Sequence, residues 1–250
     1  MKTILRAEEV TKRSGNTTIL NRVNIEIKEA ECVAVMGPSG CGKSTLLYNI
    51  SGMDVITEGS VTLLEQELST LSEKKLSQLR LHKMGFVFQH IHLLKNLSLM
   101  DNIVLPGYLA KNESRTTINK RAMELMEKMG VSHLANHDMT EASGGQLQRV
   151  AICRALINNP AIVFADEPTG ALHSKSTNEV IDLLVNASQL GTAVLLVTHD
   201  VKVAAKADRV LFMLDGDIVG ETRFTKDGDQ VENRKEREAT LTKWLMKIDF

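Results

Sequence analysis

Residues 37–45 limit what this chain can fold into more than any other part of the sequence. They fit the pattern G-x-x-x-x-G-K-[S/T] and directly follow the apolar run 32–36. That context predicts a buried strand, a glycine-rich loop and the start of a helix. In such a loop, backbone N–H groups converge on phosphate oxygens, and the helix N-terminus adds positive charge. We therefore expect a polyphosphate-binding loop made of Gly37, Pro38, Ser39, Gly40, Cys41, Gly42, Lys43, Ser44 and Thr45.

The pair Lys43 and Ser44 distinguishes this loop from an ordinary turn. The lysine is expected to lie against the outer phosphates and the serine hydroxyl to ligate Mg²⁺. A structural glycine turn between a strand and a helix is the alternative interpretation. Such a turn needs one or two glycines and has no need of a lysine followed by a hydroxyl, so the phosphate-binding interpretation is favoured.

A second apolar run, residues 161–165, ends in the adjacent carboxylates Asp166 and Glu167. Open α/β sheets bind ligands at the carboxyl ends of their strands, so this pair is expected to face the phosphate-binding loop. We predict that Asp166 helps to hold Mg²⁺ through Ser44 and water, while Glu167 polarises an attacking water molecule. A solvated Asp-Glu pair at the end of a strand is the simpler alternative.

Residues 143–146 predict a second helix start that is suited to an anion. Ser143 and Gln146 have capping-box spacing ahead of an amphipathic run. Gly144 and Gly145 weaken a first helical turn but let backbone amides approach an anion closely. The alternative is a plain helix start, which does not explain the two glycines. Because this segment has no lysine of its own, it is expected to form half of a nucleotide site.

With these motifs in this order, the chain resembles the ATP-binding subunit of an ABC transporter. The resemblance extends from about Leu5 to Gly220. Within the family, the motifs of this chain are similar to those of the branch that serves macrolide export, lipoprotein release and bacitracin or bacteriocin resistance. The matching motifs are the P-loop at 37–45, the Q-loop glutamine Gln89, the signature 143–146, the Walker B end at 166–168, the D-loop position at 171–173 and the switch histidine His199.

The resemblance implies an α/β P-loop NTPase core with a mainly parallel sheet, a small antiparallel β subdomain and an inserted α-helical subdomain. It implies ATP and Mg²⁺ as ligands, with Gln89 contacting the metal and the attacking water, and His199 contacting the γ-phosphate. Without the resemblance, Gln89 would be a polar residue closing a strand and His199 a structural hydrogen-bonding group. In the family the signature completes the nucleotide site of an opposing subunit. A head-to-tail dimer, formed with a second copy of the chain, is therefore expected.

Three positions depart from the family pattern. Ser14 stands where an aromatic residue usually stacks on adenine, which predicts weak discrimination against GTP unless Phe86 or Tyr48 substitutes. His173 replaces the D-loop aspartate, which would alter communication between the two sites. Ala142 replaces the more common leucine before the signature, a mild change.

The expected organisation is a nucleotide-binding domain over residues 1–220, with the helical subdomain at about 91–157, followed by residues 221–250. That last part combines a polar segment with an amphipathic helix. The apolar stripe of this helix consists of Leu241, Trp244, Leu245 and Ile248. It is expected to pack on the body of the chain rather than on a partner or a membrane surface.

The segment His90 to Pro106, which is rich in leucine, is expected to dock the membrane partner.

The bulk composition agrees with this assignment. A formal net charge of −1 leaves no electrostatic signature of nucleic-acid binding, and the three cysteines have neither disulfide nor metal spacing, as in a reduced cytosolic chain. No apolar run approaches the ~20 residues of a membrane span, so a separate integral membrane permease is expected, with this subunit at the cytoplasmic face of the membrane. Export or antimicrobial-peptide resistance is the expected function. A regulatory, mechanotransmitting ATPase of the cell-division type is the alternative, and a DNA-repair or chromosome ATPase is disfavoured because long coiled coils are absent from the sequence.

Overall fold

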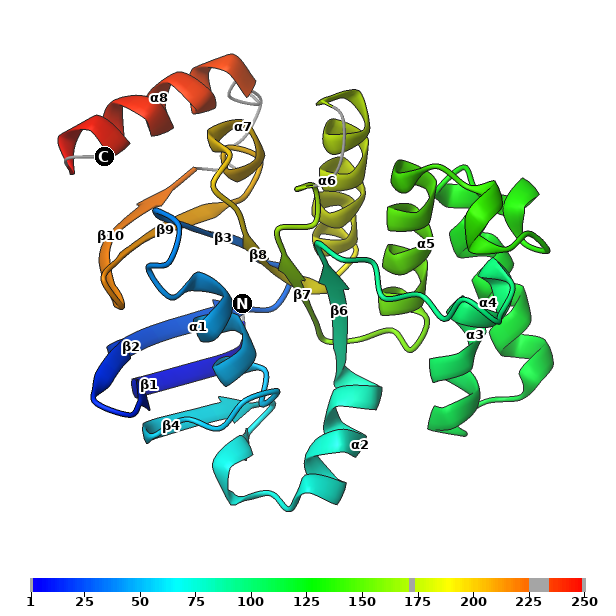
Figure 1. Cartoon of the computed structure of the whole chain (residues 1–250), viewed down its shortest axis with the longest axis horizontal. Helices are drawn as coiled ribbons and strands as arrows, with labels where there is room; N and C mark the ends of the chain where they lie inside the picture. The colour runs from blue at the N-terminus through cyan, green and yellow to red at the C-terminus, as the bar shows by residue number, and fades with distance from the viewer. Residues whose placement is uncertain (1, 171–173, 225–233, 249–250) are drawn as a thin grey trace.

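The computed structural model describes residues 2–170, 174–224 and 234–248, and it contains two β-sheets in different layers (Figure 1). The smaller sheet is antiparallel, with the strand order β2-β1-β4-β5. Its strands are β1 (Thr3–Ser14), β2 (Thr17–Lys28), β4 (Glu58–Leu63) and β5 (Gln66–Glu67). Strands β1 and β2 alternate between buried and exposed residues over much of their length, because one face of this sheet covers the core and the other meets solvent.

The larger sheet has the order β10-β9-β3-β8-β7-β6, and its neighbours from β9 to β6 are parallel. Its central strands are buried along their whole length, as continuous apolar runs require when helices cover both faces. The dipeptide Asp215-Gly216, between the apolar runs 209–214 and 218–219, is a hairpin signal in the sequence. Both residues have positive φ and close the antiparallel hairpin of β9 and β10. The strands are β3 (Cys32–Met36), β6 (Met84–Phe88), β7 (Ile162–Asp166), β8 (Ala193–Val197), β9 (Arg209–Leu214) and β10 (Asp217–Arg223).

Helix α1 (Lys43–Ile50) lies between the two sheets. Its buried residues Leu46, Leu47 and Ile50 belong to the same apolar cluster as β1, β2 and the near face of β3. The helix starts where β3 ends, so the phosphate-binding loop is fixed at the carboxyl edge of the larger sheet. The other helices of this part are α2 (Glu73–Lys83), α6 (Ser174–Gln189) and the short α7 (Val201–Ala204), with η1 (Leu68–Thr70) after β5.

The expected helical insert lies between β6 and β7 in sequence and to one side of the larger sheet in space (Figure 1). Helix α4 begins after Ser114, whose Oγ accepts from Thr117 N, and ends before Gly130, as its sequence predicts. The insert consists of α3 (Leu99–Ala110), α4 (Arg115–Lys128), η2 (Ser132–Leu134), η3 (Met139–Glu141) and α5 (Gly144–Leu156).

The last described helix, α8 (Arg234–Lys247), packs on the body of the chain. Leu241 and Leu245 are buried, and the Trp244 ring meets Phe212 of β9 edge-on, with 6.5 Å between the ring centroids. The predicted packing of the amphipathic stripe is therefore confirmed. Within the described ranges, no helix combines the length and the apolar character that crossing a bilayer requires.

Candidate active site

The phosphate-binding loop turns tightly between β3 and α1. Gly37 has φ near 150°, and a Cβ at this position would lie 2.1 Å from the carbonyl oxygen of Met213, so no other residue fits. Gly42 precedes α1 in the left-handed region, with φ near 104°. The loop therefore presents its backbone at a helix N-terminus, the arrangement that binds phosphate.

Lys43 lies across this loop, almost fully buried. Its Nζ donates to the carbonyl oxygens of Gly37 (2.9 Å) and Pro38 (2.8 Å). Among the residues that the structure describes, no carboxylate forms an ion pair with it. A buried ammonium group without an anionic partner is costly, so the loop fits an anionic ligand such as the phosphates of a nucleotide.

Asp166, at the end of β7, receives two hydrogen bonds from one face of α1. Ser44 Oγ donates to its Oδ1 and the Tyr48 hydroxyl to its Oδ2, each at 2.9 Å. Burial, together with the hydrogen bond to Asp166, raises the pKa of Tyr48 to about 12, so the phenol stays protonated at neutral pH. The carboxylate and hydroxyl oxygens at this point are hard ligands that suit Mg²⁺.

Glu167 and His199 meet at the same edge of the sheet. The strands β7 and β8 are parallel neighbours, with Asp166 opposite Val197, and Glu167 N donates to Val197 O at 3.0 Å. His199 Nδ1 lies 3.2 Å from Glu167 Oε1. Both residues line an open hollow of about 370 Å³ that also includes Thr169. A carboxylate and an imidazole next to a space for water are suited to general-base chemistry.

Gln89 follows β6 and reaches the same region. Phe88 pairs with Asp166 in the sheet, and a Cβ added to Gly170 would lie 2.7 Å from Gln89 Nε2, so the glutamine side chain packs on the backbone just beyond Glu167. The buried Gln148 of α5 donates from Nε2 to Phe88 O at 3.1 Å. The end of β6 is thereby tied both to the carboxylates and to the helical insert.

The signature segment forms the predicted capping box but lies elsewhere. Ser143 Oγ accepts from Gln146 N, and Gln146 Oε1 accepts from Ser143 N at 2.8 Å. Ser143 and Gly144 are exposed. In Figure 1, β6 and β7 stand between α5 and the phosphate-binding helix α1. The structure thus gathers the residues of the P-loop, Walker B, Q-loop and switch positions, and it leaves residues 143–146 apart from them.

Both aromatic residues considered as substitutes for adenine stacking already have partners in the structure. The Phe86 ring stacks with those of Phe88 and Phe164, with ring centroids 6.0 and 5.6 Å away. The hydroxyl of Tyr48 is bonded to Asp166. Ser14 itself is exposed at the end of β1, next to the hairpin turn. The D-loop position His173 lies outside the described residues.

Sequence reasoning considered Tyr48 only for adenine stacking and missed its hydrogen bond to Asp166. The available signal was its spacing from Ser44, since residues i and i+4 share one face of a helix. Gln148 was missed as well, because the carbonyl group that it contacts is distant in sequence.

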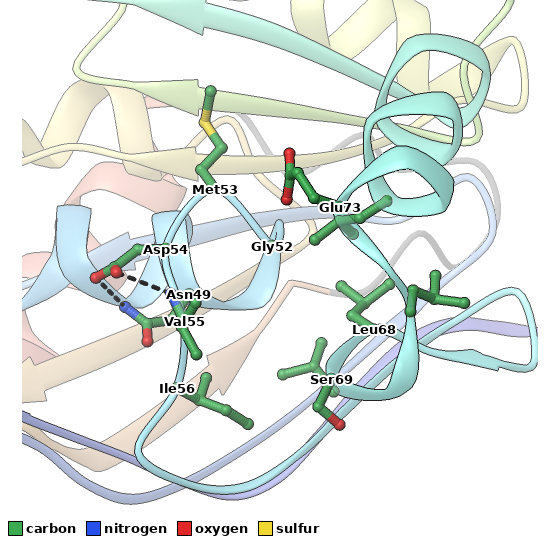
Figure 2. Close-up of a pocket in the computed structure, with 12 residues that line it drawn as sticks. Asn49, Gly52, Met53, Asp54, Val55, Ile56, Leu68, Ser69 and Glu73 are labelled. Carbon is green, nitrogen blue, oxygen red and sulfur yellow. Dashed lines mark hydrogen bonds between the residues drawn. The ribbon is translucent and has the colours of Figure 1, made fainter.

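A separate apolar hollow of about 230 Å³ lies at the far end of α1 (Figure 2). Asn49 and the backbone of Val55 both hydrogen-bond the Asp54 carboxylate at its rim. The remaining lining is largely apolar and includes Met53, Leu68 and residues of α2. This hollow lacks the phosphate-binding groups and is distinct from the carboxyl edge of the sheet.

Comparisons with known proteins agree with this geometry. Residues 20–170 match the family model described as "ABC transporter". The macrolide export ATP-binding/permease protein MacB of Pasteurella multocida is 38% identical over 228 residues, which are 90% of this chain and 35% of that protein. The chain therefore spans about a third of the length of this curated relative.

Solved structures match over most of the chain. The ATP-binding cassette MJ0796, solved as a dimer in a post-hydrolysis state with ADP and Pi, has a TM-score of 0.82 and 38% identity, covering 90% of this chain and 100% of that one. The ADP conformation of the cassette MJ1267 has a TM-score of 0.80 at 24% identity, covering 97% and 96% of the two chains, and supports the fold alone.

Proposed function

The chain belongs to the ABC transporter family, and we propose that ATP hydrolysis at its carboxyl-edge site powers an integral membrane permease, in export or antimicrobial-peptide resistance. The observation that carries this proposal is the convergence of Lys43, the Ser44–Asp166 bond and the Glu167–His199 pair at one edge of the sheet. The similarity to the export protein MacB favours transport over the regulatory alternative.

In this mechanism, the loop of residues 37–45 binds the ATP phosphates, and Lys43 turns from its loop carbonyls to the outer phosphate oxygens. Ser44, Gln89 and Asp166 would hold Mg²⁺, which supplies charge neutralisation at the phosphates when bound. Glu167 orients a water molecule and accepts its proton as the water attacks the γ-phosphate. His199 hydrogen-bonds the γ-phosphate side and registers its loss.

A second copy of the chain completes each site. The signature residues Ser143, Gly144, Gly145 and Gln146 lie apart from the P-loop of their own chain, and they present an exposed helix N-terminus. In a head-to-tail dimer, this helix end would contact the nucleotide held by the opposing P-loop. The dimeric structure of MJ0796 supports dimerisation in general.

Mixing two inactive variants tests the head-to-tail arrangement. Lys43→Ala disables the P-loop and Ser143→Arg obstructs the signature, so either homodimer has no intact site. A heterodimer of the two contains one intact site, formed by the normal P-loop of one subunit and the normal signature of the other. Purified, doubly tagged heterodimers should regain ATPase activity. If they stay as inactive as the parents, each chain uses its own signature or none.

The permease would dock at a groove between the core and the helical insert, at the cytoplasmic face of the membrane. This groove, about 310 Å³ in volume, lies between α2, β6, α3 and α5, and its lining includes Met53, Phe86, Pro106 and Arg154. It adjoins the proposed docking segment 90–106 and the strand that leads to Gln89. Movement of the insert when the γ-phosphate is lost would therefore reach the permease.

Copurification from membranes tests the transport assignment. The full chain with an affinity tag should retain an integral membrane protein, and ATP turnover should change when that protein is present in detergent or vesicles. The proposal is contradicted if no integral membrane protein copurifies with the chain and membrane proteins leave its ATP turnover unchanged.

A further inference from the structure

The two donors on Asp166 come from a single face of α1. Ser44 and Tyr48 are four residues apart and reach different oxygens of the same carboxylate, each at 2.9 Å. Two hydrogen bonds to the two oxygens fix both the position and the plane of a carboxylate. The orientation of Asp166 is therefore set by the helix that begins at the phosphate-binding loop.

The Tyr48 side chain is itself held by its surroundings. Its ring lies 6.5 Å from that of Phe88, the residue that pairs with Asp166 across β6 and β7. The backbone carbonyl oxygen of Tyr48 accepts hydrogen bonds from Met53 N and Asp54 N, and these bonds anchor the end of α1. The phenol therefore reaches Asp166 from a supported position rather than from a mobile surface.

We propose that Tyr48 is a positioning residue for the metal site, because its hydroxyl orients Asp166 and Asp166 in turn orients the Ser44 hydroxyl. This inference rests on the proposed role of Ser44 and Asp166 toward Mg²⁺. Since Ser44 uses its proton to donate to Asp166 Oδ1, its oxygen lone pairs are directed away from the carboxylate and are available to a cation. Groups behind the direct ligands of a metal fix ligand geometry and thereby metal affinity.

The groups that hold the phosphates differ from the groups that orient the metal ligands. The phosphates are held by the loop and Lys43, whose ammonium group donates to the loop carbonyls of Gly37 and Pro38, whereas the Tyr48 hydroxyl donates to Asp166. Removal of the phenol oxygen should therefore leave metal-free ATP binding unchanged and weaken only the binding of the metal. A purely structural role in α1 would weaken both, because the helix supports the loop.

The test uses the full chain with Glu167→Gln to stop turnover, and it compares Tyr48→Phe with Tyr108→Phe. Tyr108 is the other tyrosine of the chain and hydrogen-bonds Asn119 in the helical insert, so its variant loses a phenol oxygen away from the nucleotide. Mn²⁺ affinity in the presence of ATP is measured by electron paramagnetic resonance, and ATP affinity is measured separately in EDTA. Ser44→Ala reports the effect of losing the direct ligand.

Tyr48→Phe should lower Mn²⁺ affinity about tenfold, as expected for loss of a hydrogen bond to a charged group, with ATP affinity in EDTA unchanged. Mn²⁺ affinity equal to that of Tyr108→Phe would overturn the proposal, as would a parallel loss of ATP affinity in EDTA. If the parent shows no ATP-dependent Mn²⁺ binding, the metal site of the proposed function fails and this inference fails with it. Tyr48→Met, which also lacks the hydroxyl, replaces Tyr48→Phe should that variant not fold.

Discussion

At the scale of single residues, Glu167 shows how the backbone and the chemistry of the site are linked. Its φ is near 43°, in the left-handed region that few non-glycine residues adopt. The bond from its N–H to Val197 O holds this conformation and directs the side chain to His199. Strained backbone that is held by its neighbours is a feature of functional positions.

Replacing Glu167 should separate ATP hydrolysis from ATP binding. Glu167→Gln keeps the shape and hydrogen-bonding capacity of the side chain but removes the base, so turnover should fall at least ~100-fold with ATP affinity retained. Lys43→Ala should weaken ATP binding itself, because it removes the buried cation of the loop. Steady-state ATPase assays and equilibrium binding check both variants. Near-normal turnover in Glu167→Gln would assign the base elsewhere.

Ser14 supplies a second prediction at this scale. Because Ser14 has no aromatic face, and Phe86 and Tyr48 already contact other groups, the chain should bind ATP and GTP with similar affinity. Ser14→Tyr should raise ATP affinity about fivefold, from a stacking contribution of about 1 kcal/mol. Thr17→Tyr, on the strand residue that pairs with Ser14, is the matched control. The stacking register is wrong if the two variants bind ATP equally well.

At the scale of elements, the caps of α4 and α5 show which features follow from local sequence. Ser114 and Ser143 both accept a hydrogen bond from the backbone N–H three residues later, as their spacing predicts. These contacts lie within one helical turn, so the sequence determines them directly. The two helices differ in what their first turns can reach, since α5 begins with two glycines at an exposed position.

Ser143→Ala and Ser114→Ala form a matched pair that separates capping from nucleotide recognition. Each variant should lose about 1 kcal/mol of unfolding free energy, the usual contribution of a helix N-cap. Only Ser143→Ala should also reduce ATP-dependent dimer formation, measured by analytical ultracentrifugation in the Glu167→Gln background. An equal loss of dimer in both variants would mean that stability alone explains the effect.

At the scale of the whole molecule, the insert and the core are joined through the end of β6. Gln148 of α5 bonds the Phe88 carbonyl, while Gln89 packs on Gly170 beyond the carboxylates. The site and the proposed docking groove therefore share one strand. Within the predicted docking segment, Leu93 and Leu99 are buried in the core of the insert, whereas Leu94 is half exposed.

Charge at the exposed part of this surface should uncouple the permease from ATP hydrolysis. Leu94→Glu and Met53→Glu should abolish partner-stimulated turnover, because a carboxylate in an apolar interface is left without a partner. The basal ATPase activity of the isolated subunit should persist. Leu190→Glu, at an exposed leucine after α6, is the control and should respond to the permease normally. A full response in both test variants would place the interface on another surface.

The sequence by itself determined the phosphate-binding loop, the helix caps at Ser114 and Ser143, the Asp215–Gly216 turn and the ordered set of motifs that indicates an ATPase. Each of these depends on residues close together in the chain, or on an ordered set of motifs. Only the tertiary structure decided that Tyr48 bonds Asp166, that Phe86 stacks on Phe88 and Phe164 and that residues 143–146 lie apart from the P-loop. These outcomes depend on strand order and on how α1 sits between the two sheets. Such long-range packing leaves no periodic signal in the sequence.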